Sequence, residues 1–270
     1  MTERRLALLR PDQVLEELNN RRMAYLPVGL CEWHGPHLPF GVDALNAENA
    51  ALSAAEQTGG LVLPTLYFGT ERERSPEMLK WLGFSGNEWI EGMDFPANSL
   101  PSMYAREEIM AIAVREQINM AVHFGFKEIV IVSGHAAENQ LAVLDRLVKE
   151  YNAAGTARLL LVLPFVANRQ GVMEVGHASK IETSVMLALQ PQTVDLSKLP
   201  PAGEPLLNTA YAVVDYMTFL GHPTPDRTVP LADDPRQATA ETGWDAIQKA
   251  VAEIVLQVNS MTSQDSQNGG

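Results

Sequence analysis

The sequence contains a single cysteine, Cys31, so the chain cannot form an internal disulfide bond. This excludes the small secreted proteins whose folds depend on disulfides, and a reducing compartment is expected. Long apolar runs are also absent, since none reaches the roughly 18 residues that a membrane-spanning helix needs. The N-terminal region lacks the apolar core of a signal peptide. We therefore expect a cytoplasmic protein without a membrane partner.

Basic residues are scarce as well. Twenty lysines and arginines stand against 33 acidic residues, which gives a formal net charge of −13. Nucleic acids and anionic membranes bind basic surfaces, so this balance disfavours both as partners. The phosphate-binding patterns G-x-G-x-x-G and G-x-x-x-x-G-K-[ST] do not occur. We therefore expect a small-molecule substrate, no nucleic acid and no membrane.

Apolar runs alternate with segments of helical periodicity along most of the chain. The runs at residues 24–30, 61–67, 128–132 and 158–164 predict strands, and helices are expected at 11–18, 45–57, 104–124, 136–152, 181–189 and 238–258. This alternation is typical of an α/β protein with a mostly parallel sheet that helices cover on both faces. The 270 residues suffice for one large domain, expected at 1–258, followed by a disordered polar tail at 259–270.

Two segments lack sustained periodicity. Residues 69–100 combine glycine, proline and charged residues with two of the four tryptophans, and residues 191–236 are rich in proline and aspartate. Long irregular segments inside compact domains often form lids or contact surfaces. We expect residues 69–100 to cover a site or an interface.

Histidines and carboxylates follow the ends of three predicted strands. Glu32 and His34 follow the first strand and Asp43 comes shortly after them, His135 follows the strand at 128–132, and a segment from His177 to Glu182 follows the strand at 158–164 at longer range. Ligands of parallel α/β sheets bind outside the carboxyl ends of the strands, so these side chains are expected to share one site.

The stretch CEWHGPHLPFGVD concentrates these groups most strongly. If the backbone stays extended through residue 34, Glu32 and His34 point to the same side, because strand side chains alternate with a period of two. The intervening prolines and glycines would turn the chain back, so that Asp43 joins them at the start of the next helix. Between the two prolines, His37 is expected to be structural.

Imidazole and carboxylate groups without thiolate are ligands that zinc, manganese and iron accept at catalytic sites. A carboxylate such as Asp43 could bridge two ions about 3.5 Å apart. The spacing E-x-H-x8-D is not a general metal signature, however. From the spacing alone, Glu32 and His34 could equally be hydrogen-bonded polar residues at a strand end.

The stretch PVGLCEWHGPHLPFGVD closely resembles the first motif of the creatininase family of metal-dependent amidohydrolases. Three further segments are similar to family motifs in the same order: SGHAAEN, GHASKIETS and DDPRQATAETGWDAI. The resemblance spans roughly residues 24 to 255. It implies a three-layer α/β/α fold and a homo-oligomer, often a hexamer. It also implies a centre with two divalent ions. These ions would be zinc, manganese or both, and iron is a further option.

The resemblance also implies roles for individual residues. Glu32, Asp43 and His135 would hold one ion, and His34 would hold the other with Asp43 as the bridge. The remaining ligand of the second ion is left open. Glu182, in the E-T-S match, is one candidate, and the other is Glu138, which lies close behind His135. With Glu182 as the ligand, Glu138 is expected at the substrate.

His177 matches the histidine that moves protons in creatininase, and Ser75 lies near a family serine that contacts substrate. The implied activity is hydrolysis of a C–N bond in a small, cyclic amide. Hydrolysis of a formamide or a lactone is the alternative within the family. A catalytically inactive, metal-binding oligomeric protein is another, because Ser133, Lys180 and one additional residue in SGHAAEN depart from the family pattern.

Overall fold

A computed structural model describes residues 3–165 and 175–263 of the chain. Its centre is a parallel sheet in which the strands follow the order β2–β1–β4–β5, and β3 also pairs with β1. The strands span Met23–Gly29 (β1), Leu61–Val62 (β2), Leu66–Tyr67 (β3), Glu128–Ser133 (β4) and Arg158–Val162 (β5). Because all of these pairings are parallel, the carboxyl ends of β1 and β4 meet at one edge of the sheet.

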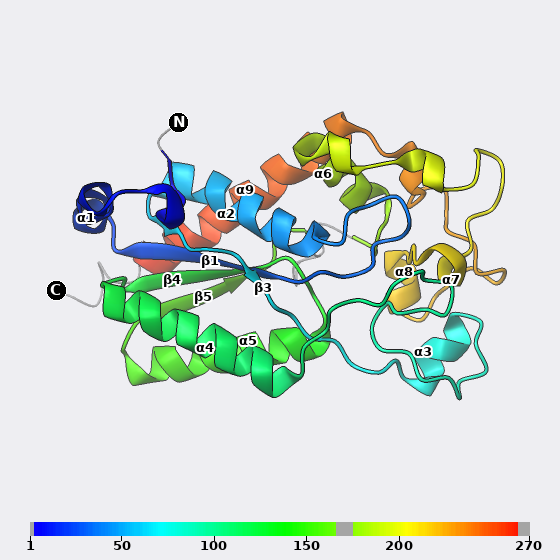
Figure 1. The fold of residues 1–270 in the computed structure, drawn as a ribbon, viewed down its shortest axis with the longest axis horizontal. Coiled ribbons are helices and arrows are strands. Elements are labelled where there is room, and N and C mark those ends of the chain that lie inside the picture. Colours follow the sequence, from blue (N-terminus) through cyan, green and yellow to red (C-terminus); the bar gives the residue numbers. More distant parts are fainter. Residues whose placement is uncertain (1–2, 166–174, 264–270) are drawn as a thin grey trace.

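Helices cover the sheet on both faces, so the molecule has three layers (Figure 1). One face carries α2 (Val42–Thr58), α6 (Lys180–Leu189) and α9 (Ala240–Ser263), and the other carries α4 (Glu107–Phe124) and α5 (Glu138–Ala154). The remaining helices are α1 (Pro11–Asn20), α3 (Pro76–Trp81), α7 (Asn208–Tyr211), α8 (Tyr216–Phe219) and four single turns, η1 (Leu6–Leu8), η2 (Pro191–Thr193), η3 (Leu196–Lys198) and η4 (Pro235–Gln237). This arrangement confirms the predicted α/β/α fold.

The side chains of β1 are apolar on both faces of the sheet, because helices cover both faces. Every residue of β1 is buried. Ala24, Leu26 and Val28 pack against the α4 and α5 layer, whereas Met23 and Tyr25 pack against the α2 and α9 layer. Alternate side chains therefore enter two separate cores, which is why a central parallel strand reads as a continuous apolar run.

Some element boundaries differ from the prediction. The strand expected at 61–67 is split into β2 and β3, because Pro64 between them has no N–H group to donate to a neighbouring strand. Helix α9 continues through Ser263, into the segment expected to be disordered, because Val258 and Met261 are buried. Residues 264–270 lie outside the described residues.

The irregular segment 69–100 is held together by a small core of its own. It contains α3 and an isolated bridge between Glu73 and Glu91. Its apolar side chains surround Trp33 in a cluster with Leu79, Leu82, Ile90, Met93 and Phe95. The segment therefore packs directly against the loop that follows β1, at the carboxyl edge of the sheet.

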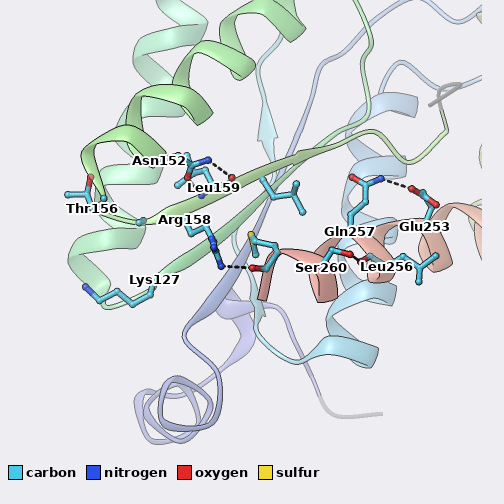
Figure 2. A pocket seen from close by; sticks show the side chains of 13 residues that line it. Lys127, Asn152, Thr156, Arg158, Leu159, Glu253, Leu256, Gln257 and Ser260 are labelled. Carbon is cyan, nitrogen blue, oxygen red and sulfur yellow. Dashed lines mark hydrogen bonds between the residues drawn. The ribbon is translucent and has the colours of Figure 1, made fainter. Parts of the chain in front are cut away.

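A surface cavity of about 950 Å³ lies at the opposite, amino edge of the sheet, between β5 and α9 (Figure 2). Lys127, Arg158 and Gln257 are among the residues that line it. The histidines and carboxylates singled out by the sequence are not among its lining residues. In the described part of the chain, no helix is both long enough and apolar enough to cross a membrane.

Candidate metal centre

A closed loop follows β1 and carries the first two polar residues. The N–H of Glu32 donates to the carbonyl of Phe40 at 2.9 Å, which returns the chain toward its starting point. Gly35 supplies the left-handed conformation that this turn requires, with φ of 74°. Helix α2 then begins at Val42, so Asp43 lies in its first turn, next to the end of β1. The predicted return of the chain is confirmed.

Two glycines allow the first turn of α2 to rest directly on the strand ends. A Cβ atom at Gly29 would lie 2.4 Å from the backbone nitrogen of Ala44, and one at Gly134 would lie 1.9 Å from the carbonyl oxygen of Asp43. Both distances are shorter than any side chain tolerates. Any larger residue at either position would push Asp43 away from the strand ends.

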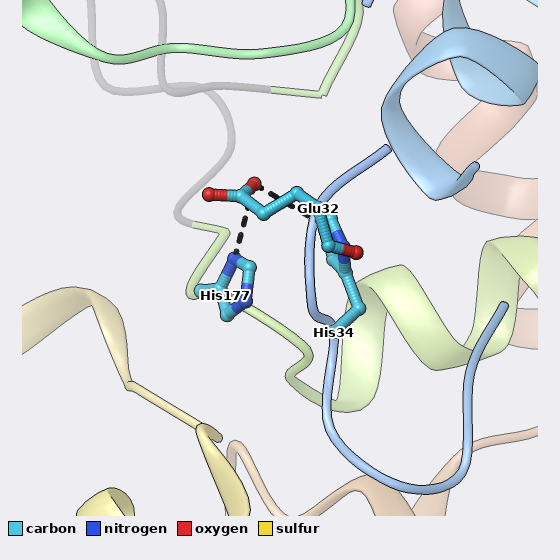
Figure 3. A group of neighbouring side chains, drawn as sticks. All are labelled: Glu32, His34 and His177. Carbon is cyan, nitrogen blue, oxygen red and sulfur yellow. Dashed lines mark hydrogen bonds and ion pairs between the residues drawn. The ribbon is translucent and has the colours of Figure 1, made fainter. Parts of the chain in front are cut away.

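Six buried or nearly buried ionisable side chains meet at this edge. They form three overlapping groups, and the candidate ligand atoms within each group lie within 4.8 Å of one another. The groups are Glu32, Asp43 and His135; His34, Asp43 and Glu182; and Glu32, His34 and His177. Figure 3 shows the third group, in which the Glu32 carboxylate is directed at His177 and His34.

Asp43 belongs to both of the first two groups. Its Oδ1 lies 3.3 Å from His34 Nε2, and its Oδ2 lies 3.5 Å from His135 Nδ1. Glu32 Oε2 lies 3.3 Å from the same nitrogen of His135. Each oxygen of Asp43 therefore faces a different histidine, as a bridging carboxylate would.

The outer hydrogen bonds of two histidines orient their rings. His34 Nδ1 donates to the carbonyl of Glu32 at 3.1 Å, and His177 Nε2 donates to the carbonyl of Trp33 at 2.7 Å. Carbonyl oxygens only accept, so these two nitrogens carry protons. His34 Nε2 and His177 Nδ1 are thereby directed at the carboxylates, which is the arrangement found for metal-binding histidines.

The donor set fits divalent metal ions. His34 Nε2 and Asp43 Oδ2, which face each other's groups in the cluster, are buried without a hydrogen-bond partner. Within the described residues, the ion-pair partners of Glu32, Asp43 and Glu182 are histidines rather than lysine or arginine. Buried polar groups without partners are costly, and nitrogen and oxygen donors of this kind suit zinc, manganese or iron.

Comparisons with known proteins identify the family of this chain. The creatininase family model, described as creatinine amidohydrolase, matches residues 7–258. The chain belongs to the creatininase family. A curated creatinine amidohydrolase from Pseudomonas putida is 29% identical over 199 residues, which cover 67% of this chain and 70% of the relative. Membership confirms the predicted enzyme class, a metal-dependent hydrolase that acts on C–N bonds.

Solved structures support the same fold. A crystal structure of creatinine amidohydrolase (creatininase) superposes with a TM-score of 0.65 at 22% identity, covering 96% of this chain and 98% of that chain. A putative creatinine amidohydrolase from Bacteroides fragilis gives a TM-score of 0.63 at 21% identity, with 97% of each chain covered. At these identities the likeness establishes the creatininase fold.

The two carboxylates left open by the sequence lie at different places in the structure. Glu182 Oε2 lies 3.8 Å from His34 Nε2 and accepts the N–H of Ala178 at 2.6 Å. Ala178 has a φ of 52°, a conformation that is strained for alanine. Glu138, the first residue of α5, is exposed on the cavity rim and belongs to none of the groups formed by the described residues.

The other predicted residues lie around this centre. Ser75 caps α3, where its hydroxyl accepts the N–H of Met78 at 3.2 Å, and it also lines the cavity. His37 has the structural position expected of it, since its Nε2 lies 2.9 Å from Thr183 Oγ1, next to Glu182 on α6. None of the tryptophans lines the cavity among the described residues.

A cavity of about 530 Å³ opens over this cluster, and five of the six side chains line it, whereas His34 lies behind them. Its walls come mainly from residues 71–75, 134–139 and 175–177. The predicted covering role of the segment 69–100 is therefore confirmed for residues 71–75, which form one wall. A cavity of this volume matches a small-molecule ligand.

Sequence reasoning missed two residues that support the ligands. Tyr104 donates its hydroxyl hydrogen to Glu32 Oε1 at 2.6 Å. Gln140 donates to the Ser133 hydroxyl at 3.0 Å, and that hydroxyl donates to the His135 carbonyl at 2.7 Å. Ser133, a departure from the family pattern, thus holds the backbone of His135 in place. No local spacing signalled Tyr104, because it lies 72 residues from Glu32 in sequence.

The protonation of the cluster opposes metal binding. Burial lowers the pKa of His34, but the Asp43 and Glu182 carboxylates outweigh burial and raise that pKa to about 10. Burial raises the pKa of Glu182 to about 7. In the metal-free protein at neutral pH, His34 therefore carries a proton that an incoming cation must displace.

We predict that metal uptake at neutral pH releases protons and that the apparent affinity rises with pH. The sign follows from the raised pKa of His34, because competition by protons weakens as the pH approaches that value from below. Calorimetric titration of Mn²⁺ in buffers of different ionisation enthalpy, from about pH 6 to about pH 8, measures the protons released. Binding without proton release at neutral pH would contradict this account.

We also predict that Gly134→Ala weakens metal binding, because the new Cβ would collide with the Asp43 carbonyl. Overpacking of this kind costs about 1–3 kcal/mol of stability. Gly41→Ala is a matched control, since a Cβ there would meet nothing closer than 3.6 Å. Thermal unfolding and Mn²⁺ titration of both variants test the close approach, and equal behaviour of the two would refute it.

Proposed function

We propose that this protein hydrolyses a C–N bond of a small, cyclic amide at a centre of two divalent metal ions. The observation that carries the proposal is the position of Asp43, whose two carboxylate oxygens face histidines of two different groups. Glu32 and His135 would complete one ion site, and His34 and Glu182 would complete the other. A single carboxylate shared by two ions is the arrangement of many two-metal hydrolases.

Similar proteins support metal binding and a small substrate. The solved creatininase structures include a manganese form, a mutant of the zinc–zinc type and a mutant complexed with creatine. We propose that this chain likewise binds zinc or manganese, with iron as a further option, and that its substrate is a small amide. When bound, such ions polarise a carbonyl and lower the pKa of water, so that hydroxide is available at neutral pH.

His177 is proposed to carry the proton to the leaving nitrogen. Burial, together with the nearby positive charge of His34, lowers the pKa of His177 to about 3, so its ring is neutral at physiological pH. Its Nε2 proton is held by the Trp33 carbonyl, which leaves Nδ1 as the atom that can accept a proton on the cavity side. An imidazole fixed in this way, with one nitrogen free on the side of the reacting groups, is placed for general acid–base catalysis.

The cavity walls set the substrate. Ser75 and Glu138 both line the cavity, and we propose that they contact substrate. The region from residue 70 to residue 95 is longer and richer in tryptophan than the family pattern, so we propose the amide class rather than creatinine itself. A homo-oligomer, a hexamer by the family resemblance, and a cytoplasmic location stay predictions.

A hydrolysis screen tests the proposed reaction. Cyclic ureides, lactams, formamides and lactones are offered to protein loaded with Mn²⁺, Zn²⁺ or Fe²⁺, and we expect turnover of a cyclic ureide or lactam. Asp43→Ala should remove metal and activity together, because Asp43 faces both groups. Full activity of a folded, metal-depleted Asp43→Ala protein would refute the two-metal centre. Metal binding without turnover of any compound would favour the inactive scaffold.

The proton-carrying role of His177 is tested by His177→Ala. We expect metal stoichiometry to stay unchanged while the turnover number falls by about 10²–10⁴, the usual contribution of a general acid or base. Metal analysis and steady-state kinetics on the most rapidly cleaved compound measure both effects. Loss of a bound ion in this variant would instead make His177 a ligand, as its proximity to Glu32 and His34 also allows.

A further inference from the structure

Tyr104 connects the irregular segment to a candidate metal ligand. Its hydroxyl donates to Glu32 Oε1 at 2.6 Å and accepts the N–H of Met93 at 2.9 Å. A phenol has one hydrogen to donate, and here the carboxylate receives it. With the backbone donor of Met93 on its other side, the hydroxyl is held in a single orientation.

The turn that presents Met93 is built around this hydroxyl. A Cβ atom at Gly92 would lie 2.2 Å from Tyr104 Oη, and Gly92 has a φ of 52°. Arg74 Nε donates to the Gly92 carbonyl at 2.6 Å, which fixes the turn from the cavity side. Glycine at position 92 is therefore required for the close approach of the phenol to the Met93 N–H.

The backbone on both sides of Glu32 is tied to the residues beside Tyr104. The N–H of Met103 donates to the Cys31 carbonyl at 2.8 Å, and the N–H of Trp33 donates to the Ser102 hydroxyl at 3.0 Å. The two chain segments therefore lie in a fixed register. That register brings the Tyr104 hydroxyl to one specific oxygen of Glu32.

This bond decides which oxygen of Glu32 faces the histidines. Oε1 is occupied by Tyr104, whereas Oε2 lies 3.3 Å from His135 Nδ1 and 3.8 Å from His34 and His177. We propose that Tyr104 is a positioning residue of the metal centre, which holds Glu32 so that a single oxygen faces the group it shares with Asp43 and His135. The inference rests on the proposed metal centre.

The substitution Tyr104→Phe tests this role by Mn²⁺ titration of metal-free protein, with free Mn²⁺ counted by electron paramagnetic resonance. We expect the dissociation constant of one binding step to rise about 10-fold or more, as for other groups that orient metal ligands, while the second step is unchanged. Tyr25→Phe is the matched control. Tyr25 is also buried, and its hydroxyl bonds to Thr58 Oγ1 at 2.5 Å, on the α2 side of the sheet.

Gly92→Ala provides a second, independent test, because its new Cβ displaces the Tyr104 hydroxyl without removing it. This variant should weaken the same binding step as Tyr104→Phe. Wild-type affinity in both variants would overturn the proposal. A general structural effect would also overturn it. In that case both binding steps would weaken equally, and the unfolding temperature of the metal-free protein would fall further than it does in Tyr25→Phe. If the wild-type protein bound no Mn²⁺ or Zn²⁺, the metal centre and the role of Tyr104 would fall together.

Discussion

Glu32, Asp43 and Glu182 lie close together, and among the described residues none of the three forms an ion pair with lysine or arginine. Because burial penalises charged groups that lack partners, this concentration of negative charge must be balanced from within the pocket. In the metal-free protein, protons on the histidines provide the balance, and the carboxylates raise the pKa of His34 and His135 for that reason. Bound divalent ions would neutralise the carboxylates in place of these protons. Proton binding and metal binding are therefore linked, because they use the same atoms.

The fold meets this constraint through close backbone contacts rather than through additional side chains. Gly29 and Gly134 end neighbouring strands, and both lie against the first turn of α2. The helix start thereby brings Asp43 between the histidines that the two strands deliver. The parallel sheet supplies the common edge, and the burial of every residue of β1 keeps that edge rigid enough to hold the ligands in register.

Much of this arrangement could be predicted from the sequence, because it depends on local patterns. The apolar run at 24–30 and the proline and glycine turn before Asp43 each have a short-range physical reason. The strand alternation expected through residue 34 does not apply, because β1 ends at Gly29. The positions of Glu182 and Glu138 depend instead on distances across loops, and Glu138 lies on the cavity rim where the additional residue of SGHAAEN precedes α5. Tyr104 could not be predicted, since long-range packing alone brings it to Glu32. Gln140 lies only five residues from His135, but no sequence pattern marks its hydrogen bond to the His135 carbonyl.

The irregular segment 69–100 was the least predictable part of the chain. It both forms a wall of the cavity and contacts the residue that orients Glu32. Residues 71–75 form a wall of the cavity, and Arg74 in that wall holds the Gly92 carbonyl. The adjacent Met93 N–H holds the phenol of Tyr104, which in turn holds Glu32. Only three hydrogen bonds therefore separate a side chain on the cavity wall from a candidate metal ligand. A substrate that displaced Arg74 would act on the same contacts that orient Glu32, so changes in this wall would alter substrate choice and the metal centre together.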